Sequence, residues 1–201
     1  MDRTRPLKAL ILALALGAGM LAGCGAEDEG TAGERAAASS DADEAHREGL
    51  AFPLGGLEYN VYITRQLNLR LPEDKAYYNG PDAPAGSAYY GVFLEVCNRE
   101  QDGEPRRSAE RFTIHDTQGN EFEPVELEET NPFAYQPGVV EPGQCVPAKG
   151  SIPQLGPTGG ALLMFELPQE ATENRPLELE ISGGFDVLES ERETLAFELD
   201  I

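Results

Sequence analysis

Cysteines are the residues of this sequence with the widest chemical range, because a thiol can serve as a nucleophile, a metal ligand, a disulfide partner or a lipid attachment point. The chain has three of them, Cys24, Cys97 and Cys145, and two histidines. Cys24 comes directly after an apolar run at residues 9–23, whereas the other two lie far from any such run. The surroundings of the three cysteines therefore indicate different roles.

The N-terminal segment predicts export and a lipid anchor. MDRTRPLK carries three basic residues, and the apolar run that follows ends in small residues, which is the composition of a secretory signal. The run is shorter than the roughly 20 residues that a transmembrane helix needs. Leu-Ala-Gly-Cys at residues 21–24 resembles the bacterial lipobox, which implies that a signal peptide at residues 1–23 is removed and that Cys24 is acylated. The alternative is an ordinary signal peptide with an incidental cysteine.

Residues 24–53 are expected to form a flexible acidic linker between the lipidated cysteine and a folded domain at residues 54–201. Eight acidic residues lie between Glu27 and Glu48, alanine supplies nearly all of the apolar content, and His46 is expected to face solvent. A segment of this composition buries too little apolar surface to offset the entropy lost on ordering. We therefore expect it to hold the domain away from the lipid surface.

Cys97 and Cys145 remain once Cys24 is acylated, and an even number of cysteines in an exported domain favours a disulfide. The alternative is a cysteine that acts as a nucleophile with His115 as its base, but His115 is expected to be an exposed residue beside a turn. Neither the spacing of a zinc site nor a G-x-S-x-G motif occurs in the sequence. We therefore expect a protein that is not an enzyme and that has no cofactor and no metal.

The charge of the chain limits its partners. Removal of residues 1–23 leaves 12 basic and 35 acidic residues, a formal charge of −23. Such a surface repels phosphate backbones, so nucleic acid is not an expected partner. A divalent cation is the alternative ligand, with two groups of candidate acids: Glu73 and Asp74 with Asp82, and Glu126, Glu128 and Glu129. Neither group forms a recognised calcium loop.

The elements that must position these residues are expected to be short strands. Apolar residues alternate in 57–67, where Leu57, Tyr59, Val61 and Ile63 are expected to share the buried face. Residues 88–98 and 159–168 are apolar on both faces, which is typical of central strands. Further strands are expected at the following ranges: 111–116 and 120–122, joined by a turn at Asp116–Gly119, then 176–182 and 194–201.

Seven to nine strands without a long amphipathic helix predict an all-β fold, an immunoglobulin-like antiparallel β-sandwich. The chain also resembles the telokin-like, immunoglobulin-like domain of bacterial lipoproteins over most of residues 55–182. The segments that carry the resemblance are GLEYNVYITRQLN, YYGVFLEVCN, RFTIHDTQGNEFEP, EPGQ ahead of ALLMFELP, and RPLELEI. The resemblance implies an exported binding module without a known reaction.

The chain departs from that pattern in a long insertion at 68–87, a proline-rich segment at 131–157 and an added C-terminal strand. Loops on a rigid sandwich commonly carry binding. We therefore expect a non-catalytic module that binds an envelope protein, or else a small ligand or a cation, through these two segments. The candidate binding residues are the aromatic side chains Tyr77, Tyr78, Phe133 and Tyr135, which would alternatively cap an open edge of the sandwich.

Overall fold

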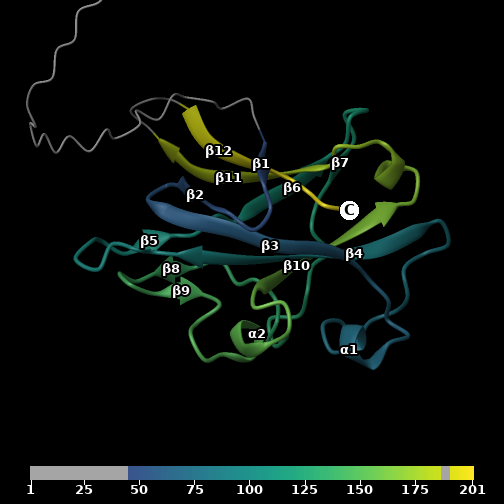
Figure 1. Cartoon of the computed structure of the whole chain (residues 1–201), viewed down its shortest axis with the longest axis horizontal. Helices are drawn as coiled ribbons and strands as arrows, with labels where there is room; N and C mark the ends of the chain where they lie inside the picture. Colours follow the sequence, from purple (N-terminus) through teal and green to yellow (C-terminus); the bar gives the residue numbers. More distant parts are fainter. Residues whose placement is uncertain (1–44, 187–190) are drawn as a thin grey trace, which may run out of the picture. The chain divides into compact units, whose positions relative to one another are not determined.

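A computed structural model describes residues 45–186 and 191–201 of the chain (Figure 1). The predicted signal peptide, Cys24 and most of the predicted linker lie outside the described residues. None of the helices in the described ranges has the length and apolar character needed to span a membrane.

Two five-stranded sheets make up most of the structure, as Figure 1 shows. The first has the order β1 (His46–Arg47), β12 (Glu191–Glu198), β11 (Glu178–Asp186), β6 (Arg111–His115) and β7 (Glu121–Phe122). The second has the order β10 (Ala161–Pro168), β4 (Ser87–Cys97), β3 (Leu57–Leu67) and β2 (Ala51–Leu54), and β9 (Cys145–Val146) also pairs with β4. The pairs are antiparallel except for β1 with β12.

The remaining elements are small. The strands β5 (Arg106–Arg107) and β8 (Val139–Val140) pair with each other, and the helical turns are α1 (Pro72–Lys75), α2 (Ile152–Leu155) and η1 (Ala171–Glu173). Each of the seven expected ranges overlaps a strand of the structure, namely β3, β4, β6, β7, β10, β11 and β12, whereas β1 and β2 lie outside those ranges. The all-β prediction is therefore confirmed.

The main core lies between the two sheets, and we call it the inner core. It contains alternate residues of the long strands, among them Tyr90, Val92 and Leu94 of β4 and Leu163 and Phe165 of β10. Each is less than a tenth exposed. Alternation places these side chains on one face of each strand, so that two sheets bury them together.

A second apolar cluster, the outer core, covers the opposite face of the β10–β4–β3–β2 sheet. Its buried members are Leu67, Tyr77, Tyr89, Phe93, Leu162 and Met164. The residues that cover the sheet come from the 68–87 insertion and from residues 125–133. Gly91 sits where β4 would otherwise add a side chain to this layer, and a Cβ there would lie 2.9 Å from the Phe93 ring. β4 and β10 are apolar on both faces because the inner core covers one face and the outer core covers the other.

The alternation predicted for β3 fails at one position. The pairing of β3 with β4 shifts register between Val61 and Ile63, as at a β-bulge. Beyond the shift Ile63 is 40% exposed and Thr64 is 3% exposed. A bulge inserts one extra residue and so exchanges the faces of the residues that follow it. The prediction that Ile63 is buried is therefore wrong.

The predicted linker also ends too late in the sequence. Residues 46–47 and 51–54 form strands, so the folded part begins before residue 54. His46 stacks on Phe52, with ring centroids 3.7 Å apart, and therefore does not simply face solvent. Glu48 accepts backbone hydrogen bonds from Thr64 (3.0 Å) and Asp200 (3.3 Å). The acidic, alanine-rich composition does not reveal the Glu48 contacts, because they are made to residues 16 and 152 positions away.

Candidate functional site

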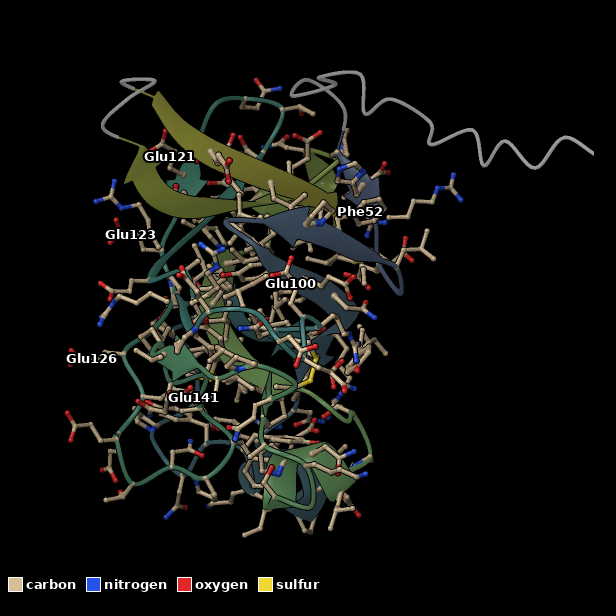
Figure 2. The ribbon with its side chains drawn as sticks, turned by 90° about the vertical axis from the view of Figure 1, so that its left-hand side faces the viewer. Phe52, Glu100, Glu121, Glu123, Glu126 and Glu141 are labelled. Carbon is tan, nitrogen blue, oxygen red and sulfur yellow. A yellow bond between two sulfur atoms is a disulfide. The ribbon has the colours of Figure 1, made fainter. Side chains whose placement is uncertain are left out.

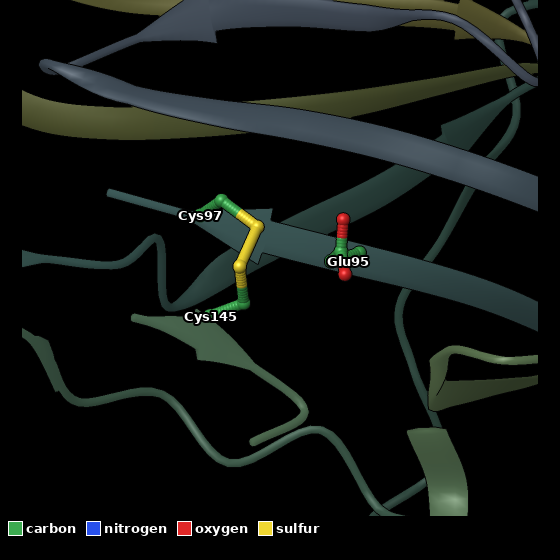
Figure 3. Close-up of side chains that lie close together, drawn as sticks. All are labelled: Glu95, Cys97 and Cys145. Carbon is green, nitrogen blue, oxygen red and sulfur yellow. A yellow bond between two sulfur atoms is a disulfide. The ribbon is translucent and has the colours of Figure 1, made fainter. Parts of the chain in front are cut away.

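The two cysteines of the domain form a disulfide, as predicted. Cys97 on β4 and Cys145 on β9 are directly opposite each other in the antiparallel pair, and their sulfurs are joined (Figure 3). In the described part of the chain, the one group of acidic, cysteine or histidine side chains close enough to share a metal ion is Glu95 with these two cysteines. Their sulfurs are bonded to each other, so neither is available as a thiolate ligand or as the nucleophile of a pair with His115.

His115 lies on the outer face of the other sheet, on β6. Its Nδ1 is 3.9 Å from Glu121 and its Nε2 is 3.7 Å from Glu180, and its side chain is 32% exposed. It is therefore flanked by carboxylates on a sheet face, and it is less exposed than the sequence predicted. The geometry does not combine His115 with a nucleophile.

Asp116 organises the turn that follows β6. Its carboxylate accepts hydrogen bonds from the backbone of Gln118 and Asn120 and from the side chains of Asn120 and Asn174. Burial alone would raise the pKa of Asp116, but these hydrogen bonds outweigh it and hold the pKa at about 2. The predicted turn is therefore fixed by a carboxylate that also ties it to Asn174, the residue after η1.

The four aromatic residues predicted as a binding surface are largely buried. Tyr77 is 2% exposed and belongs to the outer core, where its ring contacts Phe93 and Phe133 edge-on. Tyr135 is 7% exposed and belongs to the inner core. Tyr78 and Phe133 are half-buried against the outer core. An exposed recognition patch made of these residues is therefore ruled out, because covering the sheet uses their apolar surface.

Asp74, a predicted cation ligand, instead bonds to Arg65 and to the backbone of Asn68. It is buried, forms an ion pair with Arg65 and accepts a hydrogen bond from the Asn68 backbone at 2.7 Å. Burial alone would raise the pKa of Asp74, but these contacts, the bond from Arg65 above all, bring the pKa below its usual range. The Arg65 guanidinium also lies 5.6 Å from the centre of the Tyr77 ring. Asp74 therefore holds the 68–87 insertion to β3, and its carboxylate is not free for a cation.

The best candidate site is a cleft between the edges of the two sheets, with a volume of about 550 Å³. Four segments line it: residues 110–112 at the start of β6, residues 123–127 with Glu129, residues 134–137, and residues 162–164 of β10. The size lies within the range of ligand-binding pockets, roughly 300–1,000 Å³. We call this cavity the edge cleft.

Buried apolar side chains form the floor of the edge cleft, and carboxylates stand at its rim. Phe112, Tyr135, Leu162 and Met164 are each less than a tenth exposed. Four glutamates and one arginine among the lining residues are exposed to solvent: Glu110, Glu123, Glu126, Glu129 and Arg111. Figure 2 shows Glu121, Glu123 and Glu126 following one another along one side of the domain. The edge cleft therefore combines an apolar base with a net negative rim.

Backbone hydrogen bonds hold the walls of the edge cleft in place. Val125 N donates to Met164 O at 2.6 Å, and Tyr135 N donates to Leu162 O at 2.8 Å. The Tyr135 hydroxyl donates to Ala109 O at 2.9 Å, while Ala109 N donates to the Tyr59 hydroxyl at 2.7 Å. Burial raises the pKa of Tyr135, so this donor stays protonated. The two segments that cross between the sheets, residues 123–129 and 134–137, are thus attached to β10, and the second is also attached to Ala109, which precedes β6.

Sequence reasoning found some of these residues but not the edge cleft. Glu126 and Glu129, two of the predicted cation ligands, lie at its rim, and Tyr135, one of the predicted binding residues, lies in its floor. Glu110, Arg111 and Glu123 were missed. Four segments from different parts of the chain build the cavity, and no local pattern marks their meeting point.

No protein-family model matches the chain, and no curated protein matches it. The structure is similar to the yjhA protein of Bacillus subtilis at 13% identity, covering 77% of this chain and 99% of that one, with a TM-score of 0.47. A second B. subtilis protein, ycdA, is described as a "putative lipoprotein". It is similar at 9% identity with a TM-score of 0.44, covering 77% of this chain and 39% of that one.

A β-sandwich protein of Clostridium difficile 630 is similar at 13% identity with a TM-score of 0.38, covering 77% of this chain and 96% of that one. At these identities and TM-scores the similarities have no bearing on function.

Proposed function

We propose that the protein is a lipoprotein held on the extracytoplasmic face of the bacterial membrane by Cys24, and that its domain is a non-catalytic module that binds a partner protein of the cell envelope. The edge cleft is the observation that carries the binding part of this proposal. The anchor is supported by residues 21–24, which match the lipobox at the end of an apolar run.

A preformed cleft suits binding better than a flexible loop does. Both crossing segments of the edge cleft are attached to β10 or Ala109 by hydrogen bonds, so little order has to be gained when a partner binds. The mixture of an apolar floor and a charged rim is that of a protein interface, whose centre is apolar and whose rim is polar. The same features support a module that recognises rather than transforms its ligand.

The anchor is tested by fractionating cells that express the chain or its Cys24→Ala variant. We expect the chain in the membrane fraction, labelled by a fatty-acid analogue, and the variant without the label and released from the membrane. A variant that stays in the membrane fraction would contradict the lipid anchor.

The binding function is tested by chemical cross-linking on intact cells, followed by mass spectrometry of the proteins attached to this chain. We expect one reproducible envelope protein, with cross-links that map near the edge cleft. Absence of any partner, while a known envelope complex is cross-linked in the same sample, would contradict the proposal.

A divalent cation or a small ligand is the second candidate, because Glu126 and Glu129 line the same cleft. A ligand that binds only the folded state raises stability by RT ln(1 + [L]/Kd). A rise in the melting temperature of the chain with millimolar calcium, lost in Glu126→Gln/Glu129→Gln, would favour this function over protein binding.

A further inference from the structure

An open strand edge borders the edge cleft. Among the described strands, β6 pairs with β11 along its whole length, from Arg111 to His115, but it pairs with β7 only at Ile114 and His115. The chain leaves β6 after β7, because Pro124 pairs with Phe165 of β10 in the other sheet. Residues 111–113 therefore have a strand partner on one side only, and two of them, Arg111 and Phe112, line the edge cleft together with Glu110.

An open edge of this kind is a template for another strand. In a strand the backbone groups of alternate residues point to opposite sides. Asp116 N donates to Asn120 O on the β7 side, so the N–H and C=O groups of Phe112 point to the open side, where a second chain in an extended conformation can pair with them. Glu123 stands at one end of the opening, because it follows β7, which pairs with Ile114 and His115. Gln136 and Pro137 stand at the other end, because they precede Gly138, whose carbonyl accepts a hydrogen bond from Ser108 N at 2.8 Å. The opening therefore accommodates a short extended segment of a few residues rather than a full-length strand.

The charge around this edge indicates which kind of segment can bind there. Glu110, Glu123, Glu126 and Glu129 outnumber Arg111 among the lining residues, and Glu110 also pairs with Arg107 at 2.6 Å. In an extended segment successive side chains point in opposite directions, so that one set reaches the apolar floor while the other reaches the rim. Basic side chains at the rim and apolar side chains over Phe112 and Tyr135 match both surfaces.

We propose that the edge cleft binds a short, extended, positively charged segment of a partner protein, which adds as a strand to residues 111–113 of β6. This inference rests on the proposed binding function and names the class of ligand. Backbone pairing supplies affinity in this mode, and the alternation of basic and apolar side chains supplies specificity.

The test uses three capped peptides and the full chain in detergent, with binding measured by isothermal titration calorimetry. The peptides are KVKVK, its acidic counterpart EVEVE, and KVKVK with N-methyl groups on the valine nitrogens, which removes backbone donors without changing charge. We expect KVKVK to bind at least about tenfold more tightly than either of the other two.

Protein variants locate the peptide. Glu123→Gln/Glu126→Gln/Glu129→Gln removes rim charge, whereas Glu73→Gln/Glu100→Gln/Glu173→Gln removes the same charge from exposed sites that do not line the edge cleft. We expect the first variant to weaken KVKVK binding by about tenfold and the second by no more than about twofold. All six positions are exposed, so both variants are expected to fold.

Equal loss in the two triple variants, equal binding of the N-methylated peptide, or no binding of KVKVK would each overturn the inference. Failure of this inference can be distinguished from failure of the proposed binding function. A cross-linked envelope partner that contacts the domain away from the edge cleft would leave the binding function intact while excluding strand addition at β6.

Discussion

The two faces of the β10–β4–β3–β2 sheet are covered in different ways. The inner face packs against another sheet, and its residues alternate with period two along β4 and β10 and along β3 as far as its bulge, in strands of 8 to 11 residues. The outer face is covered by the 68–87 insertion and residues 125–133, which contain short turns and few strand pairs. The segments without regular structure are therefore not free loops. They complete the fold, and the edge cleft lies where residues 123–137 cross from β7 to β10.

The largest expected effect comes from breaking the inner core. Phe165 is fully buried on β10, and Phe165→Ala should lower the free energy of unfolding by as much as about 5 kcal/mol, because it removes a large side chain and leaves a cavity. Urea denaturation measures the loss. Leu155→Ala, at a site that is 73% exposed, is the control and should change stability by no more than about 0.5 kcal/mol. Equal losses would mean that Phe165 is not in a core.

The disulfide joins the regular strand β4 to β9, which belongs to the irregular 131–157 segment. Cys97→Ala/Cys145→Ala opens a loop with a sequence separation of 48 residues, and the chain-entropy model gives a loss of about 4 kcal/mol. A reductant should destabilise the chain by a similar amount and leave the double variant unaffected. A reductant that changes neither protein would show that the bond is absent.

Breaking the outer core should have a smaller and more local effect. Tyr77→Ala removes contacts with Phe93 and Phe133, at a cost of about 3 kcal/mol. Hydrogen exchange should speed up in residues 68–87 and 125–133 while β11 and β12 remain protected. Faster exchange in all strands would show that the two cores are a single cooperative unit and would remove the distinction between them.

The smallest effect concerns the turn after β6. The pKa of Asp116 is about 2 in the folded chain, below its value in an unfolded chain, so its contribution to stability is complete above about pH 4 and is lost as the pH falls to about 2. The difference in unfolding free energy between the chain and Asp116→Asn should therefore shrink over this range. A difference in unfolding free energy that is the same at pH 5 and at pH 2 would contradict the lowered pKa of Asp116.

The strands were predictable because each signal is local. β3 occupies 57–67 as expected, and β4 and β10 lie within two residues of the expected ranges, since alternation and flanking turn residues lie within a single segment. Ile63 was misplaced because the bulge depends on the pairing with β4. β1 and β2 were missed because the acidic, alanine-rich stretch around them shows no alternating apolar pattern. The contacts of His46 with Phe52 and Phe197 are visible only in the folded chain.

The candidate site was less predictable than the strands. Tyr77 and Tyr135 lie in segments rich in turn-forming residues, where no period shows whether an aromatic side chain faces solvent or covers a sheet. The edge cleft depends on where β7 ends and on how residues 123–137 cross to β10, which are properties of the folded chain. Its glutamates were visible in the sequence, but a chain with 36 acidic residues offers many such groups.

We propose that binding occurs at the edge cleft and not at the tips of the irregular segments. Site-specific photo-cross-linking in intact cells tests it most directly, with a photoreactive amino acid placed either at Glu126, on the rim of the edge cleft, or at Leu155, on the exposed helical turn α2. We predict an adduct with an envelope protein from position 126 and none from position 155. An adduct from position 155 alone would contradict this account.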